Sequence, residues 1–448
     1  MALPHLFLSI YSCDPAFGSE LTVGWHRLLH AARDARVWAV TEDRGQQARV
    51  DAGLAEAGLA DRVRLRYLAH DAIERRAMDT PGGFYWAYRR WQRRALCVAQ
   101  GVHDAVGLDL LHHVNMVGYR EPGFLYRLAA EAGIPLVLGP VGGTQNMPAA
   151  FAWRDSARAG AVETARTIAN DAQLRLARRF HAAARQATTV LAATSTGVAD
   201  LKRVGIDADR LLETGAPPAG TARRWAERAP GPVRVLWASE FIYRKGLDLM
   251  LDAHQRLRAS GLDVHLHLLG DGPLRGLVPA DDPTVHWDGR IPREAVLARY
   301  QTADVFAFTS VRDTSGNVML EALAAGLPVV YLDHQGAHDM GSAACGVPVP
   351  VRSPDQVADG LAAGIRKAVA HPETYDALSA GAIARAKALA WDVNAQAMAA
   401  IYQRALSANP STPDLTDDDD ARSAEPTAWN EAALRAATVR PLVSPVWT

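Results

Sequence analysis

The chain has 448 residues, of which 49% are hydrophobic and 22% charged, and its formal net charge is −1. This length predicts two sizeable domains, and the composition excludes a chain that is disordered over most of its length. The near-neutral charge argues against a protein that binds nucleic acid through bulk positive charge.

The N-terminal residues begin the series of predicted elements. Residues 6–10 form an apolar run that is too short for the core of a signal peptide, and no basic region precedes it. No run of about 18 apolar residues occurs in the chain, so we predict no membrane-spanning helix. Cys13, Cys97 and Cys345 are far apart in sequence, which excludes a disulfide framework and a structural zinc site and fits a reducing compartment. We therefore expect a buried first strand and a cytoplasmic protein.

Short apolar runs alternate with longer helical patterns along the chain. The predicted strands are 6–11, 37–41, 63–67, 110–113, 136–139 and 190–193 in the first half, and 233–238, 265–270, 285–288, 305–309 and 329–332 in the second. Strands separated by helices predict parallel sheets with crossover connections, which is an α/β fold. Most of these runs are continuously apolar, as expected of strands covered on both faces.

The stretch Phe84–Arg94 combines aromatic and basic residues in a predicted helix. Arg89, Arg90, Arg93 and Arg94 share a side of that helix through i,i+4 spacing. The preferred interpretation is a domain helix whose aromatic side chains pack inward while the arginines are solvated. A second interpretation is contact with an anionic membrane surface, which would place the protein at the inner face of a membrane.

Six residues of the first half, in predicted loops or at strand ends, are candidates for lining a ligand cleft: Gly18, His112, His113, Asn115, Gly142 and Gly143. In open α/β sheets, ligands bind beyond the carboxyl ends of the strands. A histidine there can take part in proton transfer, or it can be an ordinary strand-end residue that bonds the backbone, and the sequence favours neither interpretation. The glycines suit a cleft wall somewhat better than ordinary turns.

Residues 216–232 are rich in proline and glycine and predict a linker between two domains, residues 1–215 and 233–384. Residues 385–406 have an Ala-rich helical pattern. Residues 407–448 are polar and acidic, and their run of four aspartates suits a solvated, disordered tail better than a metal site.

Two loops of the second half indicate a phosphate-binding cleft. Arg244 and Lys245 follow the first predicted strand of that half, and Lys245 is one of only four lysines in the chain. A lysine in a strand-to-helix loop suits a phosphate group as a point charge. Gly270 and Gly272 form only a weak dinucleotide motif because Pro273 follows at once. A tight glycine turn beside a ligand crevice is the preferred interpretation.

The densest signal lies in residues 305–330, where a polar loop joins a predicted strand to a helix that begins near Gly316 or Asn317. Ser315, Gly316, Asn317 and Val318 are expected to present free backbone N–H groups at the helix N-terminus, where the dipole favours an anion such as a diphosphate. Gly316 also permits close approach of a ligand to the backbone.

Asp313 and Glu321 flank the start of this predicted helix, eight positions apart. Both can therefore face one cleft, where carboxylates are good acceptors for the hydroxyls of a sugar. For an isolated pair, two solvated acids near a helix N-terminus would be the preferred interpretation. The predicted phosphate-binding loops next to this pair favour the other interpretation, in which both acids face one cleft.

The order of these motifs is similar to one known family. Residues 233–405 resemble the donor-binding half of family-four retaining glycosyltransferases of GT-B architecture, through Lys245-Gly246, Gly270-Asp271-Gly272-Pro273, Asp288-Gly289-Arg290, the Glu-x7-Glu motif read as Asp313 to Glu321, Gly326-Leu327-Pro328 and Trp391 with Ile401-Tyr402. The first half is similar to a polysaccharide-biosynthesis subgroup through Gly18-Ser19-Glu20, His112-His113-Val114-Asn115 and Gly139-Pro140-Val141-Gly142-Gly143. The resemblance implies two Rossmann-like doubly wound domains that face each other across a cleft, with the last helix crossing back to the first domain.

The resemblance also implies an activity, the transfer of a sugar from a nucleoside-diphosphate sugar to an acceptor hydroxyl with retention of configuration. It implies that Glu321 holds the nucleotide ribose, that Asp313 holds hydroxyls of the donor sugar, and that Lys245 neutralises the departing diphosphate. His113 is a further catalytic candidate. The donor-binding candidates are Arg244, Gly272, Ser315, Gly316, Asn317, Val318, Gly18, Gly142, Gly143, His112 and Asn115. Neither a metal ion nor a resident cofactor is expected, and the acceptor is a glycan, a glycolipid or a small molecule.

Two positions depart from the family pattern. The arginine usually found five residues before the lysine is replaced by Glu240, which would repel a phosphate, and Arg244 is the candidate to replace it. The first acid of the Glu-x7-Glu motif is Asp313, whose side chain is one methylene shorter. These departures motivate one alternative, a protein that binds nucleotide sugars without turnover. Nucleotide-sugar epimerases and sugar phosphorylases are alternatives of the same fold, and an NAD-dependent oxidoreductase is disfavoured because its glycine fingerprint is absent.

Overall fold

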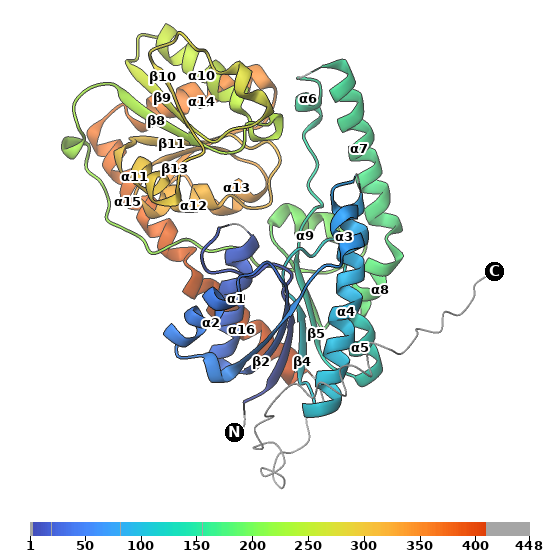
Figure 1. Cartoon of the computed structure of the whole chain (residues 1–448). Coiled ribbons are helices and arrows are strands. Elements are labelled where there is room, and N and C mark those ends of the chain that lie inside the picture. The colour runs from blue at the N-terminus through green and yellow to red at the C-terminus, as the bar shows by residue number, and fades with distance from the viewer. Residues whose placement is uncertain (1–2, 19, 81, 155, 409–448) are drawn as a thin grey trace.

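The short apolar runs of each half build a parallel sheet in the computed structural model, which describes residues 3–18, 20–80, 82–154 and 156–408 (Figure 1). The first sheet has seven strands in the order β3-β2-β1-β4-β5-β6-β7, and the second has six in the order β10-β9-β8-β11-β12-β13. Every strand pair in both sheets is parallel. Both orders are of the doubly wound type.

The strands have the following bounds: β1 His5–Ser9, β2 Arg36–Glu42, β3 Val63–Leu68, β4 Leu110–His113, β5 Leu136–Val141, β6 Thr189–Ala192, β7 Asp209–Arg210, β8 Val233–Ala238, β9 Val264–Leu269, β10 Val285–Gly289, β11 Val305–Phe308, β12 Val329–Leu332 and β13 Gly346–Val349. The predicted strands are therefore present. β7 and β13 lie outside the predicted set: β7 is a pair of exposed polar residues, and β13 contains Gly346 and Pro348. Tertiary pairing with β6 and β12 makes them strands.

The helices have the following bounds: α1 Glu20–Asp34, α2 Gln47–Glu56, α3 Ala72–Met78, α4 Gly83–Val106, α5 Leu125–Ala132, α6 Ala149–Ala152, α7 Ala157–Leu176, α8 Arg178–Gln186, α9 Ser195–Lys202, α10 Leu247–Ala259, α11 Arg293–Thr302, α12 Asn317–Ala324, α13 Gln335–Met340, α14 Pro354–Ala368, α15 Pro372–Ala388 and α16 Trp391–Ser407. None of them combines the length and hydropathy that a membrane-crossing helix needs.

Alternate residues of the central strands pack into separate cores on the two faces of each sheet. Leu6 and Leu8 of β1 pack with residues of α1 and α16, whereas Phe7 packs with Tyr88 and Trp91 of α4. In the second sheet, β8 likewise divides its side chains between a core with α10 and α14 and a core with α12 and α15. Burial on both faces explains why these strands are continuously apolar.

The chain crosses between the two domains twice, and the two crossings lie side by side. Ala216 donates a backbone hydrogen bond to the Leu389 carbonyl at 2.8 Å and forms a bridge with Ala390. This bridge separates α15 from α16, so the helical pattern predicted from residue 385 is interrupted. α16 then packs against α1 of the first domain (Figure 1). The acidic tail predicted from residue 407 lies, beyond residue 408, outside the described residues.

The predicted linker 216–232 lies along the second domain. Its Arg223 donates hydrogen bonds to the backbone carbonyls of Tyr300, Ala303 and Ala325. Several bonds from one side chain to carbonyls of three segments fix the linker on the domain surface.

The aromatic and basic stretch of α4 packs as a domain helix. Tyr88 and Trp91 are buried. The arginines are not simply solvated: Arg89 pairs with the buried Glu121, and Arg90 and Arg94 pair with the buried Glu74. These carboxylates offset much of the positive charge that would attract an anionic membrane.

Candidate active site at the interdomain cleft

The start of α12 forms one wall of a cleft of about 590 Å³ between the two domains. The predicted residues Ser315, Gly316, Asn317 and Val318 all line it. Gly316 is the N-cap residue and supplies no side-chain acceptor to the first N–H groups of the helix. A Cβ at Gly316 would lie 2.5 Å from the Phe308 ring, so glycine is required there. This wall presents the positive end of a helix dipole to the cleft.

Lys245 and Arg244 line the same cleft from the loop that follows β8. The Lys245 ammonium group pairs with the Asp313 carboxylate, and Arg244 Nη1 lies 3.9 Å from Asp313 Oδ1. The Thr309 hydroxyl donates to the Lys245 carbonyl at 2.7 Å, which ties the two loops together. Gly246 has a φ of 72°, a left-handed conformation that glycine adopts without strain. The loop geometry therefore holds both cations beside the α12 N-terminus.

Asp313 and Glu321 also line this cleft, so the structure brings both acids together with Lys245. Glu321 Oε1 accepts a hydrogen bond from Arg293 at 2.9 Å, and its Oε2 lies 3.2 Å from the Tyr300 hydroxyl. The Asp313 backbone amide donates to Gln335 Oε1 at 2.9 Å. Each acid is thus held by groups of its own domain and remains accessible from the cleft.

Glu240 is exposed, and the cleft is lined without it. The expected repulsion between this carboxylate and a phosphate in the cleft is therefore corrected: the replacement lies outside the site. Arg244, four residues later, lines the cleft instead.

Three of the donor-binding candidates in the first domain line a second cavity, of about 200 Å³, and a fourth lines the cleft. Gly142 and Asn115 line the second cavity, as does Gly143, and Gly18 lines the cleft. Asn115 donates to the Ser12 carbonyl at 2.7 Å and to the Glu20 carbonyl at 3.1 Å. It therefore fixes the start of α1 against the end of β4.

His112 and His113 do not reach either space, so their assignment as ligand-contacting residues is corrected. Both rings are buried, with exposures of 0% and 1%. His112 Nε2 donates to the Gly139 carbonyl at 2.7 Å and its Nδ1 accepts from the Tyr402 hydroxyl at 2.6 Å. His113 Nδ1 donates to the Pro122 carbonyl at 3.1 Å. Burial lowers the pKa of His112 to about 3 and that of His113 to about 4, so both are neutral and structural near pH 7.

Gly272 does not line the cleft. A Cβ at this position would lie 2.8 Å from the Phe241 carbonyl oxygen. The glycine therefore allows two loops of the second domain to pack closely.

Several lining or supporting residues were missed by sequence reasoning. Glu213 lines both spaces, and its Oε1 accepts a hydrogen bond from Ser315 at 2.6 Å. Gln335, which holds the Asp313 amide, also donates to the Asn146 carbonyl of the first domain at 2.8 Å. Gln335 has a φ of 49°, and Met116 beside the second cavity has a φ of 56°. Such conformations are costly outside glycine and gather at functional sites.

Parts of the chain are similar in sequence to known glycosyltransferases. Residues 232–367 match the family model described as "Glycosyl transferases group 1". The putative colanic acid biosynthesis glycosyltransferase WcaL of Salmonella typhimurium is 30% identical over 157 residues, which are 30% of this chain and 39% of that protein. A D-inositol 3-phosphate glycosyltransferase of Segniliparus rotundus is 30% identical over 191 residues, 38% of this chain and 39% of that protein. The six curated matches span between 26% and 39% of the relatives' own length.

Solved structures share the fold of nearly the whole chain. Sucrose-phosphate synthase from Thermosynechococcus elongatus matches with a TM-score of 0.59 and 18% identity, over 90% of this chain and 100% of that one. Anabaena HepE, solved with UDP and glucose, matches with a TM-score of 0.54 and 15% identity over the same shares. The predicted GT-B architecture is confirmed, and so is the resemblance to group 1 glycosyltransferases, whose model matches the second domain.

Proposed function

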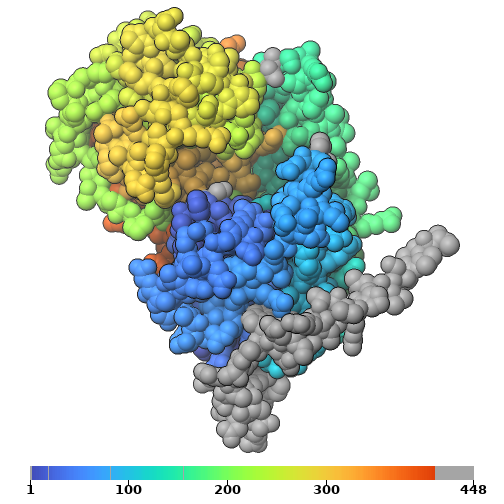
Figure 2. All heavy atoms as spheres, viewed as in Figure 1, coloured from blue at the N-terminus to red at the C-terminus, as the bar shows by residue number. Residues whose placement is uncertain are grey.

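We propose that this protein is a retaining glycosyltransferase that moves a sugar from a nucleoside-diphosphate sugar to an acceptor hydroxyl without a metal ion. The observation that carries this proposal is the convergence of Lys245, Asp313, Glu321 and the α12 N-terminus on one interdomain cleft. Figure 2 shows the molecular surface hollowed between the two domains. The match of the second domain to group 1 glycosyltransferases supports the same reaction class.

The diphosphate of the donor fits the positive end of this cleft. Lys245 and Arg244 supply positive charge, and the amides at the start of α12 supply hydrogen-bond donors. In the structure Asp313 neutralises Lys245. We infer that a bound diphosphate replaces Asp313 as the ion-pair partner of the Lys245 ammonium group. Asp313 can then bind hydroxyls of the donor sugar. These groups would perform the charge neutralisation that a metal ion performs in other transferases.

The ribose of the nucleotide fits Glu321. Its carboxylate is oriented by Arg293 and Tyr300, so it can accept hydrogen bonds from a diol with little loss of side-chain freedom. In the reaction, the bond between the sugar C1 and the diphosphate oxygen breaks as the acceptor oxygen bonds to C1. The electron pair and the acceptor's proton leave with the diphosphate, whose charge Lys245 stabilises.

Two observations bear on the alternatives and on location. Glu240 does not face the cleft, which removes one motive for a binding protein without turnover. Cys13, Cys97 and Cys345 are unpaired, which supports the cytoplasm as the site of the reaction.

A donor screen tests the proposal. Calorimetric titration with UDP-, GDP- and ADP-sugars, each with magnesium ion or with EDTA, is expected to find one base that binds equally under both conditions. UDP-sugars come first because Anabaena HepE was solved with UDP. NMR of the product anomer is expected to show the donor's configuration. Absence of donor binding, or binding without transfer or hydrolysis over a broad acceptor panel, contradicts the proposal.

A further inference from the structure

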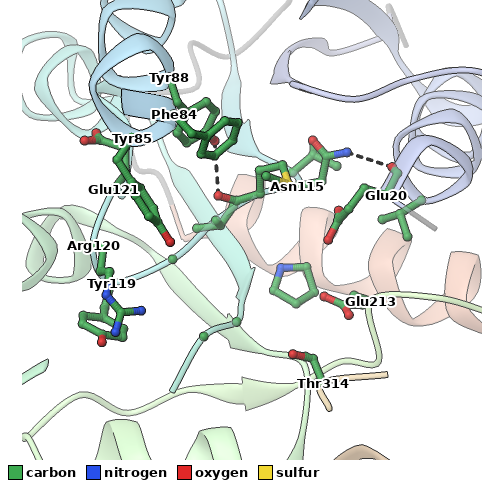
Figure 3. A pocket seen from close by; sticks show the side chains of 18 residues that line it. Glu20, Phe84, Tyr85, Tyr88, Asn115, Tyr119, Arg120, Glu121, Glu213 and Thr314 are labelled. Carbon is green, nitrogen blue, oxygen red and sulfur yellow. Dashed lines mark hydrogen bonds between the residues drawn. The ribbon is translucent and has the colours of Figure 1, made fainter. Parts of the chain in front are cut away.

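The second cavity adjoins the donor cleft through shared residues. Glu20, at the start of α1, and Glu213, after β7, line both spaces, as does Val23. Figure 3 shows the side chains of Glu20 and Glu213 pointing into the same part of the cavity from different segments. A molecule in the cavity can therefore reach a donor sugar held in the cleft.

The far wall of the cavity is aromatic. Phe84, Tyr85 and Tyr88 of α4 line it together with Tyr119 (Figure 3). Tyr85 is 46% exposed and offers the most open ring, whereas Tyr88 and Tyr119 are buried behind it. Gly118 and Gly142, which have no side chain, also line the cavity. Aromatic faces next to polar groups suit a sugar ring, which has an apolar C–H face and hydroxyls at its edge.

The charged groups that face this cavity are Glu20, Glu121, Glu213 and Arg120. Glu121 is already paired with Arg89 and Arg179. The Arg120 guanidinium is held by Asn170 at 2.6 Å and Gln173 at 3.0 Å. Glu20 and Glu213, by contrast, form no ion pair within the described part of the chain. They are the acids whose charge a bound molecule would experience most directly.

Glu20 and Glu213 share a poorly solvated setting. Burial and the nearby Glu213 carboxylate raise the pKa of Glu20 to about 8, although a hydrogen bond from the Met116 backbone amide favours the ionised form and opposes this rise. Burial and the Asp313 carboxylate raise the pKa of Glu213, although its hydrogen bond from Ser315 opposes this. Because the pKa of Glu20 is about 8, Glu20 retains its proton near neutral pH, so the pair offers a hydrogen-bond donor beside acceptor oxygens.

We propose that Glu20 and Glu213 position and select the acceptor: a neutral sugar ring lies on the aromatic wall, the two carboxyl groups hold its reacting hydroxyl and a neighbouring one, and a ring with an anionic group beside that hydroxyl is rejected. This inference rests on the proposed function of the donor cleft. The rejection follows from repulsion between like charges in a poorly solvated space.

Matched pairs of probes test the selection. Methyl glycosides of glucose, galactose and mannose are compared with the corresponding methyl uronides, which differ by a carboxylate, in saturation-transfer NMR with UDP present at pH 7. The expected result is binding of at least one neutral glycoside about tenfold tighter than its uronide, or about 1.4 kcal/mol. E20Q and E213Q are expected to reduce that preference to below about threefold, and the exposed E240Q is the control that keeps it.

A pH series separates positioning from a purely structural role. Raising the pH to about 9, above the pKa of Glu20, ionises Glu20 and is expected to weaken binding of the neutral glycoside in the wild type but less in E20Q. Equal thermal midpoints for the variants would show that they fold.

The outcomes also separate the two proposals. Equal binding of glycoside and uronide, or binding of no neutral glycoside, overturns the inference while UDP binding by calorimetry leaves the proposed function standing. Loss of all nucleotide binding in the wild type contradicts the proposed function instead.

Discussion

The two walls of the interdomain cleft were built from the sequence in different ways. The wall from the second domain comes mainly from the segments that follow β8 and β11, up to the first turns of α12, with a contribution from the start of α11. The first domain contributes Gly18, residues of α1 and the residue Glu213 after β7 to the cleft. The adjoining second cavity adds residues of α4 and of the segments after β4 and β5. The first kind of wall leaves a local pattern in the sequence, whereas the second is assembled by tertiary packing alone. Substitutions in the second-domain wall, in the first domain and outside the cleft test whether these parts also differ in what they contribute to the reaction.

The largest effect is expected at Lys245. Lys245→Ala removes the charge that neutralises the leaving diphosphate, so kcat/KM for transfer should fall by about 10²–10³. The matched control is Lys202→Ala, because Lys202 is exposed on α9 of the first domain. Steady-state kinetics of both variants measure the difference. If Lys245→Ala keeps the kcat/KM of the wild type, the second-domain wall does not stabilise the leaving diphosphate through Lys245.

A smaller loss is expected at Glu321. Glu321→Gln keeps the shape of the side chain but weakens charge-assisted hydrogen bonds to a ribose, each of which is worth about 1.5–3 kcal/mol, so donor binding should weaken about 10–100-fold. Glu294→Gln, on the exposed side of α11, is the control. Calorimetry with the nucleotide alone measures the effect. An unchanged dissociation constant means that Glu321 does not hold the nucleotide.

His113 should affect stability and not chemistry. His113→Gln breaks a buried hydrogen bond and should cost about 1–3 kcal/mol of unfolding free energy. Because folding lowers the pKa of His113 to about 4, the unfolded state binds more protons between about pH 6.5 and 4, so stability should fall as pH is lowered through that range. The free energy of unfolding of the variant, measured with urea at each pH, should therefore depend less steeply on pH than that of the wild type. A large drop in kcat at unchanged stability would restore His113 as a catalytic residue.

The smallest effect is expected at Glu240. Glu240→Arg restores the residue type that the related family uses there, yet the exposed position lies outside the cleft. Changes on the exposed surface are usually within about 0.5 kcal/mol, so donor affinity should change less than about threefold. Calorimetry with the donor nucleotide decides this. A gain of tenfold or more would show that position 240 reaches the phosphates.

Much of the fold could be predicted because it depends on local periodicity. The continuous apolar runs identified every central strand, whereas β7 is a strand only because it pairs with β6. The same reasoning placed Lys245 and Asp313, which lie between a strand and a helix, and Glu321, which lies in the helix that follows Asp313. It could not decide between two roles for His112 and His113, because their partners, such as Tyr402 and Pro122, are fixed by distant segments. Glu213 carries no motif, and only the crossing between domains brings it to the cleft.

The most direct measurement is a crystal structure with the nucleotide sugar that the donor screen selects. We expect phosphate oxygens within hydrogen-bond distance of Lys245 Nζ and of the backbone amides at the start of α12. We also expect the Asp313 carboxylate to contact the sugar and the Glu321 carboxylate to contact the ribose. A nucleotide bound elsewhere, with the Lys245–Asp313 pair undisturbed, would contradict these expectations.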